Sequence, residues 1–197
     1  MYIVKFDLNT KIKTKTLACC LYQLSKAGDI FALYGDIGSG KTTFARYFIN
    51  EAIKNIQVPS PSYNLYFKYE AKKAPIYHLD AWRIENSLEI LNLGIIDYFK
   101  ESIFLVEWAD KIEKYLPDTK LTIKIDYKMN ERTLEFYGNE NWKNRLKNYK
   151  NKDWIGFCQK RRFWTKDSSI IKNFEDLKKK IITKPRKKWE RYESIIC

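Results

Sequence analysis

A glycine-rich segment has the residue types and the spacing of a phosphate-binding loop. It reads GDIGSGKT and matches the pattern G-x-x-x-x-G-K-[ST]. Phosphate oxygens must closely approach several inward-pointing backbone N–H groups, and glycine permits this because it has no Cβ. In this pattern the lysine reaches the β- and γ-phosphates, and the following hydroxyl binds Mg²⁺. The sequence therefore predicts binding of ATP and Mg²⁺ by Gly35, Asp36, Ile37, Gly38, Ser39, Gly40, Lys41, Thr42 and the adjacent Thr43.

Two carboxylates end apolar runs and are candidates for the acids that hydrolysis needs. Glu107 follows the run Ile103–Val106, and Asp80 follows Ile76–Leu79. A P-loop protein presents its metal-linked acid at the carboxyl edge of the sheet, and a second group must orient the attacking water. We predict Asp80 and Glu107 as catalytic residues and Thr42 with Glu107 as metal ligands. Asp80 remains an alternative ligand, and which of the two acids activates water is left open.

Three neighbouring residues each have two interpretations. Trp108 follows Glu107 and is either a core residue or a neighbour of the nucleotide. His78, the only histidine, sits in mid-strand, where we favour a packing role over that of a general base. Arg83 either contacts phosphate or pairs with a nearby acid.

The pattern of apolar residues predicts the elements that position this chemistry. An apolar strand runs into the glycine loop and a helix follows it, which is the order that the loop requires. We expect an α/β fold, a P-loop NTPase-like sheet flanked by helices, that closes near residue 139. The expected strands are 2–8, 30–34, 63–69, 76–82, 103–106, 121–126 and 132–137, and the expected helices are 14–26, 42–53, 87–99 with an interruption at Gly94, and 109–116.

The positive charge is concentrated in the last part of the chain. The 197 residues carry a net charge of +13, and residues 140–197 hold 18 Lys and Arg against 7 Asp and Glu. We predict two parts, a domain over 1–139 and a basic, aromatic-rich extension over 140–197. We expect the extension to be helical, most clearly over 142–149 and 170–182. Lysine and arginine runs interleaved with tryptophan suit an RNA partner such as tRNA, and a solvated charged face is the alternative.

The cysteines and the N-terminus predict a cytoplasmic protein. The four cysteines include no C-x-x-C pair, and Cys19 and Cys20 are adjacent on an expected helix, which fits a reducing compartment. Charges occupy the N-terminal segment where a signal peptide would need an apolar run, and no stretch of about 18 apolar residues occurs.

Five segments together resemble the TsaE family. In order, they are GDIGSGKTTF, PSPSYNL, YHLDAWRI, LGIIDYF and LVEWADKIEKYLP, and the resemblance covers residues 1–139. It implies the ATPase of bacterial threonylcarbamoyl-adenosine tRNA modification, in which ATP hydrolysis resets the TsaD–TsaB pair. By matching motif, it implies that Lys41 and Thr42 hold phosphate and Mg²⁺, that Asp80 and Glu107 are the acidic groups, and that Trp108 lies near the nucleotide. The segment 60–63 resembles a switch-like loop near the γ-phosphate.

Two other functions use the same loop or the same charge. A small-molecule kinase needs an acceptor-binding insertion and an arginine-bearing lid, and only a short helix follows Glu107 before the last strands. A non-catalytic RNA-binding scaffold would hold a structural nucleotide. Turnover by the purified protein separates the three, because a kinase consumes an acceptor and a scaffold hydrolyses nothing.

Overall fold

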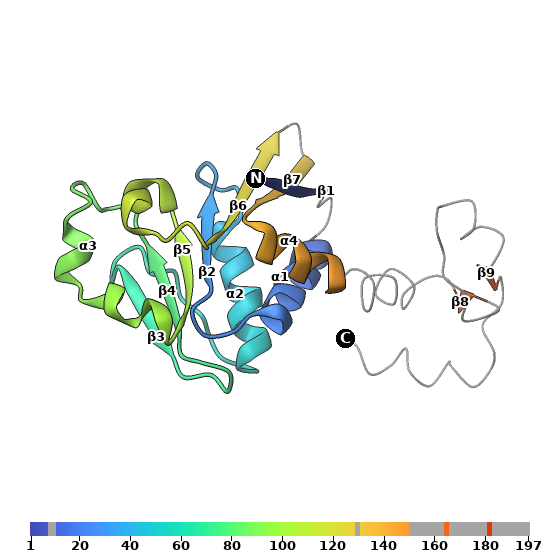
Figure 1. Cartoon of the computed structure of the whole chain (residues 1–197), viewed down its shortest axis with the longest axis horizontal. Coiled ribbons are helices and arrows are strands. Elements are labelled where there is room, and N and C mark those ends of the chain that lie inside the picture. Colours follow the sequence, from blue (N-terminus) through green and yellow to red (C-terminus); the bar gives the residue numbers. More distant parts are fainter. Residues whose placement is uncertain (8–10, 129–130, 150–163, 166–180, 183–197) are drawn as a thin grey trace. The chain divides into compact units, whose positions relative to one another are not determined.

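A mixed sheet forms the centre of the first 145 residues (Figure 1). The computed structural model describes residues 1–7, 11–128, 131–149, 164–165 and 181–182. Within them, the strand order is β1-β7-β6-β2-β5-β4-β3. The strands are β1 (Tyr2–Asp7), β2 (Ile30–Tyr34), β3 (Tyr66–Tyr69), β4 (Ile76–Asp80), β5 (Ile103–Glu107), β6 (Leu121–Lys128) and β7 (Glu131–Tyr137). The helices are α1 (Lys11–Leu24), α2 (Lys41–Ala52), α3 (Glu89–Asn92), η1 (Ile95–Lys100), η2 (Ala109–Tyr115) and α4 (Glu140–Tyr149).

The central strands are parallel, so their carboxyl ends meet at one edge. β2 lies between β5 and β6, β4 lies on the far side of β5, and all of these pairings are parallel. The register sets Leu33 beside Glu107 and Asp80 beside the same residue. The predicted phosphate loop and both predicted acids therefore leave the sheet at the same edge.

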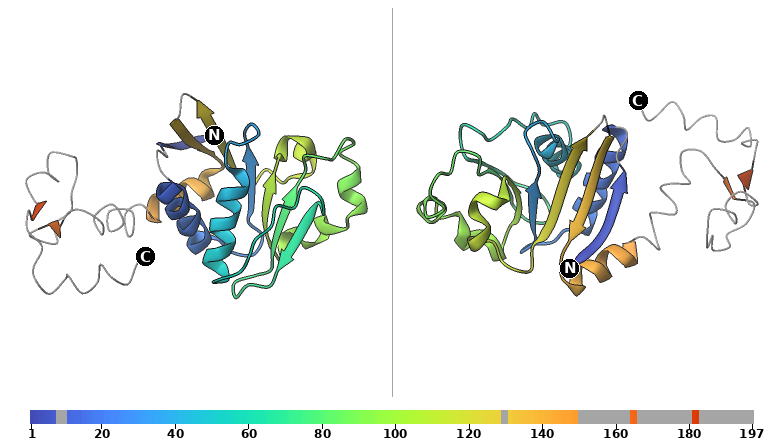
Figure 2. Two further views of the ribbon diagram at one scale, coloured as in Figure 1. Left: turned by 180° about the vertical axis from the view of Figure 1, so that it is seen from behind. Right: turned by 90° about the horizontal axis from the view of Figure 1, so that it is seen from above.

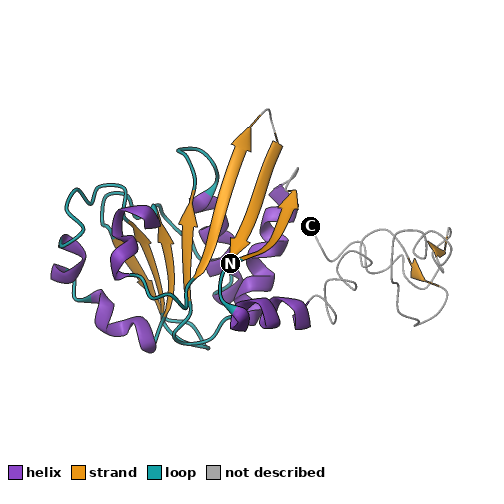
Figure 3. Cartoon of the chain, turned by 45° about the horizontal axis from the view of Figure 1, so that its top comes forward, coloured by secondary structure: helices purple, strands orange, loops and turns teal. Residues whose placement is uncertain are grey.

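Successive side chains of the buried strands point to opposite faces of the sheet, so the core has two layers. From β2, Ile30 and Ala32 pack with α3, η1 and η2 in one cluster, while Phe31 contacts Phe48 of α2 on the other face. Helices α1 and α2 pack side by side on that second face (Figure 2, left). Figure 3 shows the twisted sheet between its helices. This double cover explains why the middle strands are continuously apolar.

The expected elements of the sheet domain are found, most with their ends shifted by one to three residues. The predicted interruption of the helix over 87–99 at Gly94, whose φ is 62°, is confirmed, but the part after it, η1, is 3₁₀. The helix predicted over 109–116 is 3₁₀ and kinked at Ile112. The strand predicted over 63–69 begins only at Tyr66, because Leu65 has a left-handed backbone with φ of 63°.

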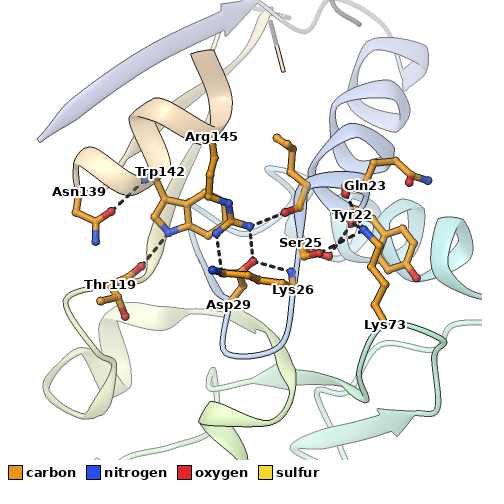
Figure 4. A network of polar contacts seen from close by, with 11 residues as sticks. Tyr22, Gln23, Ser25, Lys26, Asp29, Lys73, Thr119, Asn139, Trp142 and Arg145 are labelled. Carbon is orange, nitrogen blue, oxygen red and sulfur yellow. Dashed lines mark hydrogen bonds and ion pairs between the residues drawn. The ribbon is translucent and has the colours of Figure 1, made fainter. Parts of the chain in front are cut away.

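Two basic side chains, Arg145 and Lys73, join distant segments near the amino ends of the parallel strands, opposite the edge where the carboxyl ends meet (Figure 4). Arg145 of α4 donates to both carboxylate oxygens of Asp29 at 2.8 and 2.6 Å, and to the carbonyl of Leu24. Lys73, in the β3–β4 turn, donates to the carbonyls of Tyr22, Gln23 and Ser25 at the end of α1. The carbonyl of Tyr22 also accepts from the N–H and the hydroxyl of Ser25, so the lysine adds a charged donor to the carbonyls at the C-terminus of α1.

The first compact unit extends past the predicted boundary at residue 139, to Arg145. The indole of Trp142 is 2% exposed, stacks edge-on with Phe31, and donates from Nε1 to the carbonyl of Thr119. The beginning of α4 is thus part of the core of the sheet domain.

The second unit spans residues 146–197 and is described only in part. Its strands β8 (Trp164–Thr165) and β9 (Ile181–Ile182) pair in antiparallel fashion. The helix predicted over 170–182 falls outside the described residues except at 181–182, which are strand rather than helix. None of the helices in the described part of the chain is long and apolar enough to cross a membrane.

Candidate nucleotide site

The glycine loop joins the end of β2 to the beginning of α2, as the motif requires. The loop turns at Ser39, whose N–H donates to the carbonyl of Asp36, and α2 begins after Gly40, which has φ of 111°. The first four N–H groups of a helix have no partner within it and attract anions, and the first turn of α2 directly follows the loop. The loop therefore offers a cluster of backbone donors next to a helix dipole, which is the chemistry of a phosphate site.

The first glycine of the loop is required by the sheet beneath it. A Cβ on Gly35 would lie 2.2 Å from the carbonyl oxygen of Ile125 in β6 and 2.9 Å from Oγ of Ser39. Gly38 differs, since its Cβ would meet nothing within 4 Å and its φ is +76°. Thus Gly35 permits close packing on β6, whereas Gly38 leaves the loop tip open to a ligand.

Lys41 lies at the centre of the site and is held by the loop itself. Its Nζ donates to the carbonyls of Gly35 and Asp36 at 2.6 and 3.0 Å, and it lies 3.7 Å from the centroid of the Trp108 ring. Burial lowers the pKa of Lys41, and the negative charge of Glu107 is the largest influence in the opposite direction. A phosphate would replace these weak neutral acceptors with charged ones.

Glu107 connects the loop helix to β4 through both of its oxygens. Its Oε2 accepts from the Thr42 hydroxyl at 2.7 Å, and its Oε1 lies 2.7 Å from Nε2 of His78. Glu107 is 2% exposed and His78 is fully buried. The predicted pair of metal ligands, Thr42 and Glu107, is thus in direct contact. His78 is buried, as a packing role implies, and it also has a polar partner that the sequence did not indicate.

Asp80 is the last residue of β4, which lies next to the strand that ends at Glu107, and its carboxylate accepts two hydrogen bonds. Its Oδ2 accepts from the Ser62 hydroxyl at 2.6 Å, and its Oδ1 accepts from the N–H of Trp82 at 2.9 Å. Ser62 in turn contacts Ser60 at 2.9 Å between hydroxyl oxygens. The segment that resembles a switch loop is therefore connected directly to the second predicted acid.

Two tryptophans form an aromatic wall beside the lysine. The rings of Trp82 and Trp108 are 4.3 Å apart between centroids, at an angle of 44°. Trp108 has φ of 55°, an uncommon conformation for a bulky residue that often occurs at functional sites. Arg83 lies over the ring of Tyr63 at 4.5 Å. Trp108 is therefore a neighbour of the loop lysine, and Arg83 makes a cation–π contact at the rim.

These residues line one open cavity of about 540 Å³. The predicted site residues Ile37, Gly38, Gly40, Lys41, Thr42, Thr43, Asp80, Glu107 and Trp108 line it, together with Ser60, Ser62, Tyr63, Trp82 and Arg83. Gly35 and Asp36 instead line a second, smaller cavity towards β6. Ser39, also in the loop, is buried, and its hydroxyl lacks a partner among the described residues.

The donor set fits Mg²⁺ bound together with a nucleotide. Mg²⁺ prefers oxygen ligands and is commonly bound by one or two protein groups plus phosphates and water. Thr42 and Glu107 supply such a pair of oxygens, and the described residues contain no cluster of three or more acids, histidines or cysteines that would form a closed metal cage. The side chains suit a metal that arrives with phosphate.

The strand, glycine loop and helix, with two acids at the ends of neighbouring parallel strands, define a P-loop NTPase-like α/β fold. The crystal structure of YdiB from Bacillus subtilis matches this chain with a TM-score of 0.64 and 29% identity, covering 78% of this chain and 98% of YdiB. The family model described as threonylcarbamoyl adenosine biosynthesis protein TsaE matches residues 8–134. The chain belongs to the TsaE family.

Curated relatives agree with this assignment. The tRNA threonylcarbamoyladenosine biosynthesis protein TsaE of Bacillus subtilis is 38% identical over 114 residues, which are 57% of this chain and 71% of the relative. The protein of the same name from Rickettsia prowazekii is 35% identical over 136 residues, which are 68% of this chain and 94% of the relative. The family model ends at residue 134, so it does not reach the basic extension.

Proposed function

We propose that the chain binds and hydrolyses ATP in a cytoplasmic pathway that modifies tRNA to threonylcarbamoyladenosine, and that hydrolysis resets a TsaD–TsaB pair. The observation that carries the proposal is the contact of Thr42 with Glu107 beside the glycine loop, with Asp80 lining the same cavity. A nucleotide cradle, a metal-binding pair and a second carboxylate are the parts that phosphoryl transfer to water needs.

We assign phosphate binding, metal binding and water activation to separate groups of residues. Lys41 and the loop N–H groups bind the phosphates, and Thr42 with Glu107 holds Mg²⁺, which would neutralise charge that develops on the phosphates. Asp80 orients water and accepts its proton. We assign the base to Asp80 because its partners are a serine hydroxyl and a backbone N–H, whereas Glu107 is committed to Thr42 and His78.

Site variants test the assignment. Lys41→Ala should remove most nucleotide affinity, because a charge-assisted contact is lost. Asp80→Ala should lower turnover by roughly 10²–10⁴-fold, the usual contribution of a general base, and change nucleotide affinity little. Phosphate release is measured with the chain alone and with its TsaD and TsaB partners. Near-normal turnover in both variants would refute the site.

The same assay separates the competing functions. With ADP measured beside phosphate, a kinase would form ADP rapidly only when an acceptor is supplied and would transfer the phosphoryl group to that acceptor instead of releasing phosphate. A scaffold would bind ATP without turnover under any condition. Stimulation by the TsaD–TsaB pair, together with loss of stimulation in Asp80→Ala, is the result that the proposal requires.

A further inference from the structure

A fully buried histidine contacts the acid that the proposed function assigns to the metal. His78 lies in β4 with Ile76 and Leu79 near it in sequence, and its exposed fraction is 0%. Burial of a polar ring costs free energy unless the ring has a hydrogen-bond partner. An apolar residue would fill this position at a lower cost in free energy. The presence of a histidine therefore indicates that its contact with Glu107 has a role beyond packing.

The register of the sheet explains how the contact arises. His78 pairs with Leu105 in β5, and two residues further along each strand Asp80 pairs with Glu107. Because side chains two apart share a face, His78, Asp80, Leu105 and Glu107 lie on one face of the sheet. The imidazole therefore lies one step below the acid and reaches up to its inner oxygen, Oε1.

We propose that His78 is a positioning residue that fixes the rotation of the Glu107 carboxylate. The inference rests on the proposed function, since it gives that carboxylate a role at the metal. With Oε1 held by Nε2 of His78 at 2.7 Å, Oε2 is directed at Thr42. An ionised carboxylate only accepts hydrogen bonds, so Nε2 is the donor in this contact. Nδ1 is buried and lacks a partner among the described residues, so the contact with Glu107 is the hydrogen bond that holds the ring there.

Two amide variants test whether the side chain at position 78 must reach the Glu107 carboxylate. In His78→Gln the side-chain nitrogen can take a place close to that of Nε2, while His78→Asn is equally uncharged and polar but too short. Loss of a group that orients a metal ligand typically costs 10–100-fold in metal affinity. Nucleotide affinity is measured by calorimetry over a series of Mg²⁺ concentrations and in EDTA, with a thermal melt of each variant.

We expect His78→Asn to need at least about 10-fold more Mg²⁺ for half of the metal-dependent gain in affinity, and His78→Gln to need less than about threefold more. Affinity in EDTA should be equal in all three proteins. An unchanged Mg²⁺ requirement in His78→Asn would overturn the inference while the proposed function stands. If the wild type itself shows no Mg²⁺-dependent nucleotide binding, the proposed function fails first.

The chain contains a single histidine, which allows a test that needs no variant at position 78. Long-range ¹H–¹⁵N correlation spectra of the full chain should show one imidazole with its proton on Nε2, and Glu107→Gln should shift that signal strongly. The absence of a proton on Nε2, or a spectrum that is identical in Glu107→Gln, would overturn the inference even if the variants at His78 fail to fold.

Discussion

The packing of the loop against β6 requires glycine at position 35, whether or not a ligand is bound. The carbonyl of Ile125 comes so close that a Cβ on Gly35 would lie 2.2 Å from its oxygen. We expect Gly35→Ala to lower the free energy of unfolding by roughly 2–4 kcal/mol, in the upper range for single substitutions. Gly38→Ala is the matched control and should cost only about 1–2 kcal/mol, from its left-handed backbone. Urea denaturation measures both, and equal losses would contradict the packing role.

Trp108 should report the arrival of a nucleotide. Its ring lies against the Lys41 ammonium, which must turn towards phosphate when the site is filled. We expect Mg-ATP to change the tryptophan fluorescence of the full chain, and Trp108→Phe to remove most of that change. Trp82→Phe is the control, because Trp82 contacts Trp108 and its cation–π partner within the described part of the chain is Lys111, whereas Lys41 lies over Trp108. An undiminished change in Trp108→Phe would exclude this movement.

The sequence could predict the residues of the site better than their partners. The glycine motif indicated Lys41 and Thr42, because phosphate chemistry constrains those residue types locally, and the end of an apolar run indicated Glu107. The structure brings these side chains to one cavity. The contacts of His78 with Glu107 and of Ser62 with Asp80 join residues 29 and 18 positions apart. Such pairs depend on strand order and register, and a single sequence does not encode these as a local pattern.

The beginning of α4 should be needed for stability. Trp142 fills the core, and Arg145 pairs with Asp29, which is 8% exposed (Figure 4). Truncation after residue 139 removes both and leaves the carboxylate unpaired. We expect this truncation to cost at least about 3 kcal/mol in urea denaturation, the usual minimum for loss of a buried tryptophan or of one partner of a buried pair.

Truncation after residue 149 is the matched control, since it retains α4. It should leave the unfolding free energy of the sheet domain near that of the full chain. The anchoring role of α4 would be wrong if the two truncated chains were equally stable. Asp29→Asn in the full chain should reproduce part of the loss, because it weakens the bidentate pair with Arg145.

The elements of the sheet domain were predictable where local rules act alone. Apolar runs predicted β2, β4 and β5, since buried parallel strands need continuous apolar residues. The interruption at Gly94 was predicted, but the 3₁₀ geometry of η1 and η2 was not. The boundary near 139 was predicted from the end of the last expected strand and from the change in charge. Trp142 and Arg145 contact the core through long-range pairs that neither pattern reveals.

The whole chain combines a nearly neutral domain with a strongly basic extension. We expect labelled tRNA to bind the full chain with an affinity that falls steeply with salt, because lysines and arginines release counterions from phosphates. A chain that ends at residue 149 should bind more weakly and with a shallower salt dependence. Fluorescence polarisation at several NaCl concentrations measures both. Identical slopes for the two chains would show that the extension makes no contact with RNA phosphates.

Binding of Mg-ATP to the glycine loop is the claim on which the account depends. Calorimetry of the full chain with Mg-ATP tests it most directly, with Lys41→Ala as the comparison. We predict one site per chain, and an affinity that is about 10–100-fold lower in Lys41→Ala, the equivalent of one charge-assisted hydrogen bond. No binding to the wild type, or the same affinity in both proteins, would contradict the account.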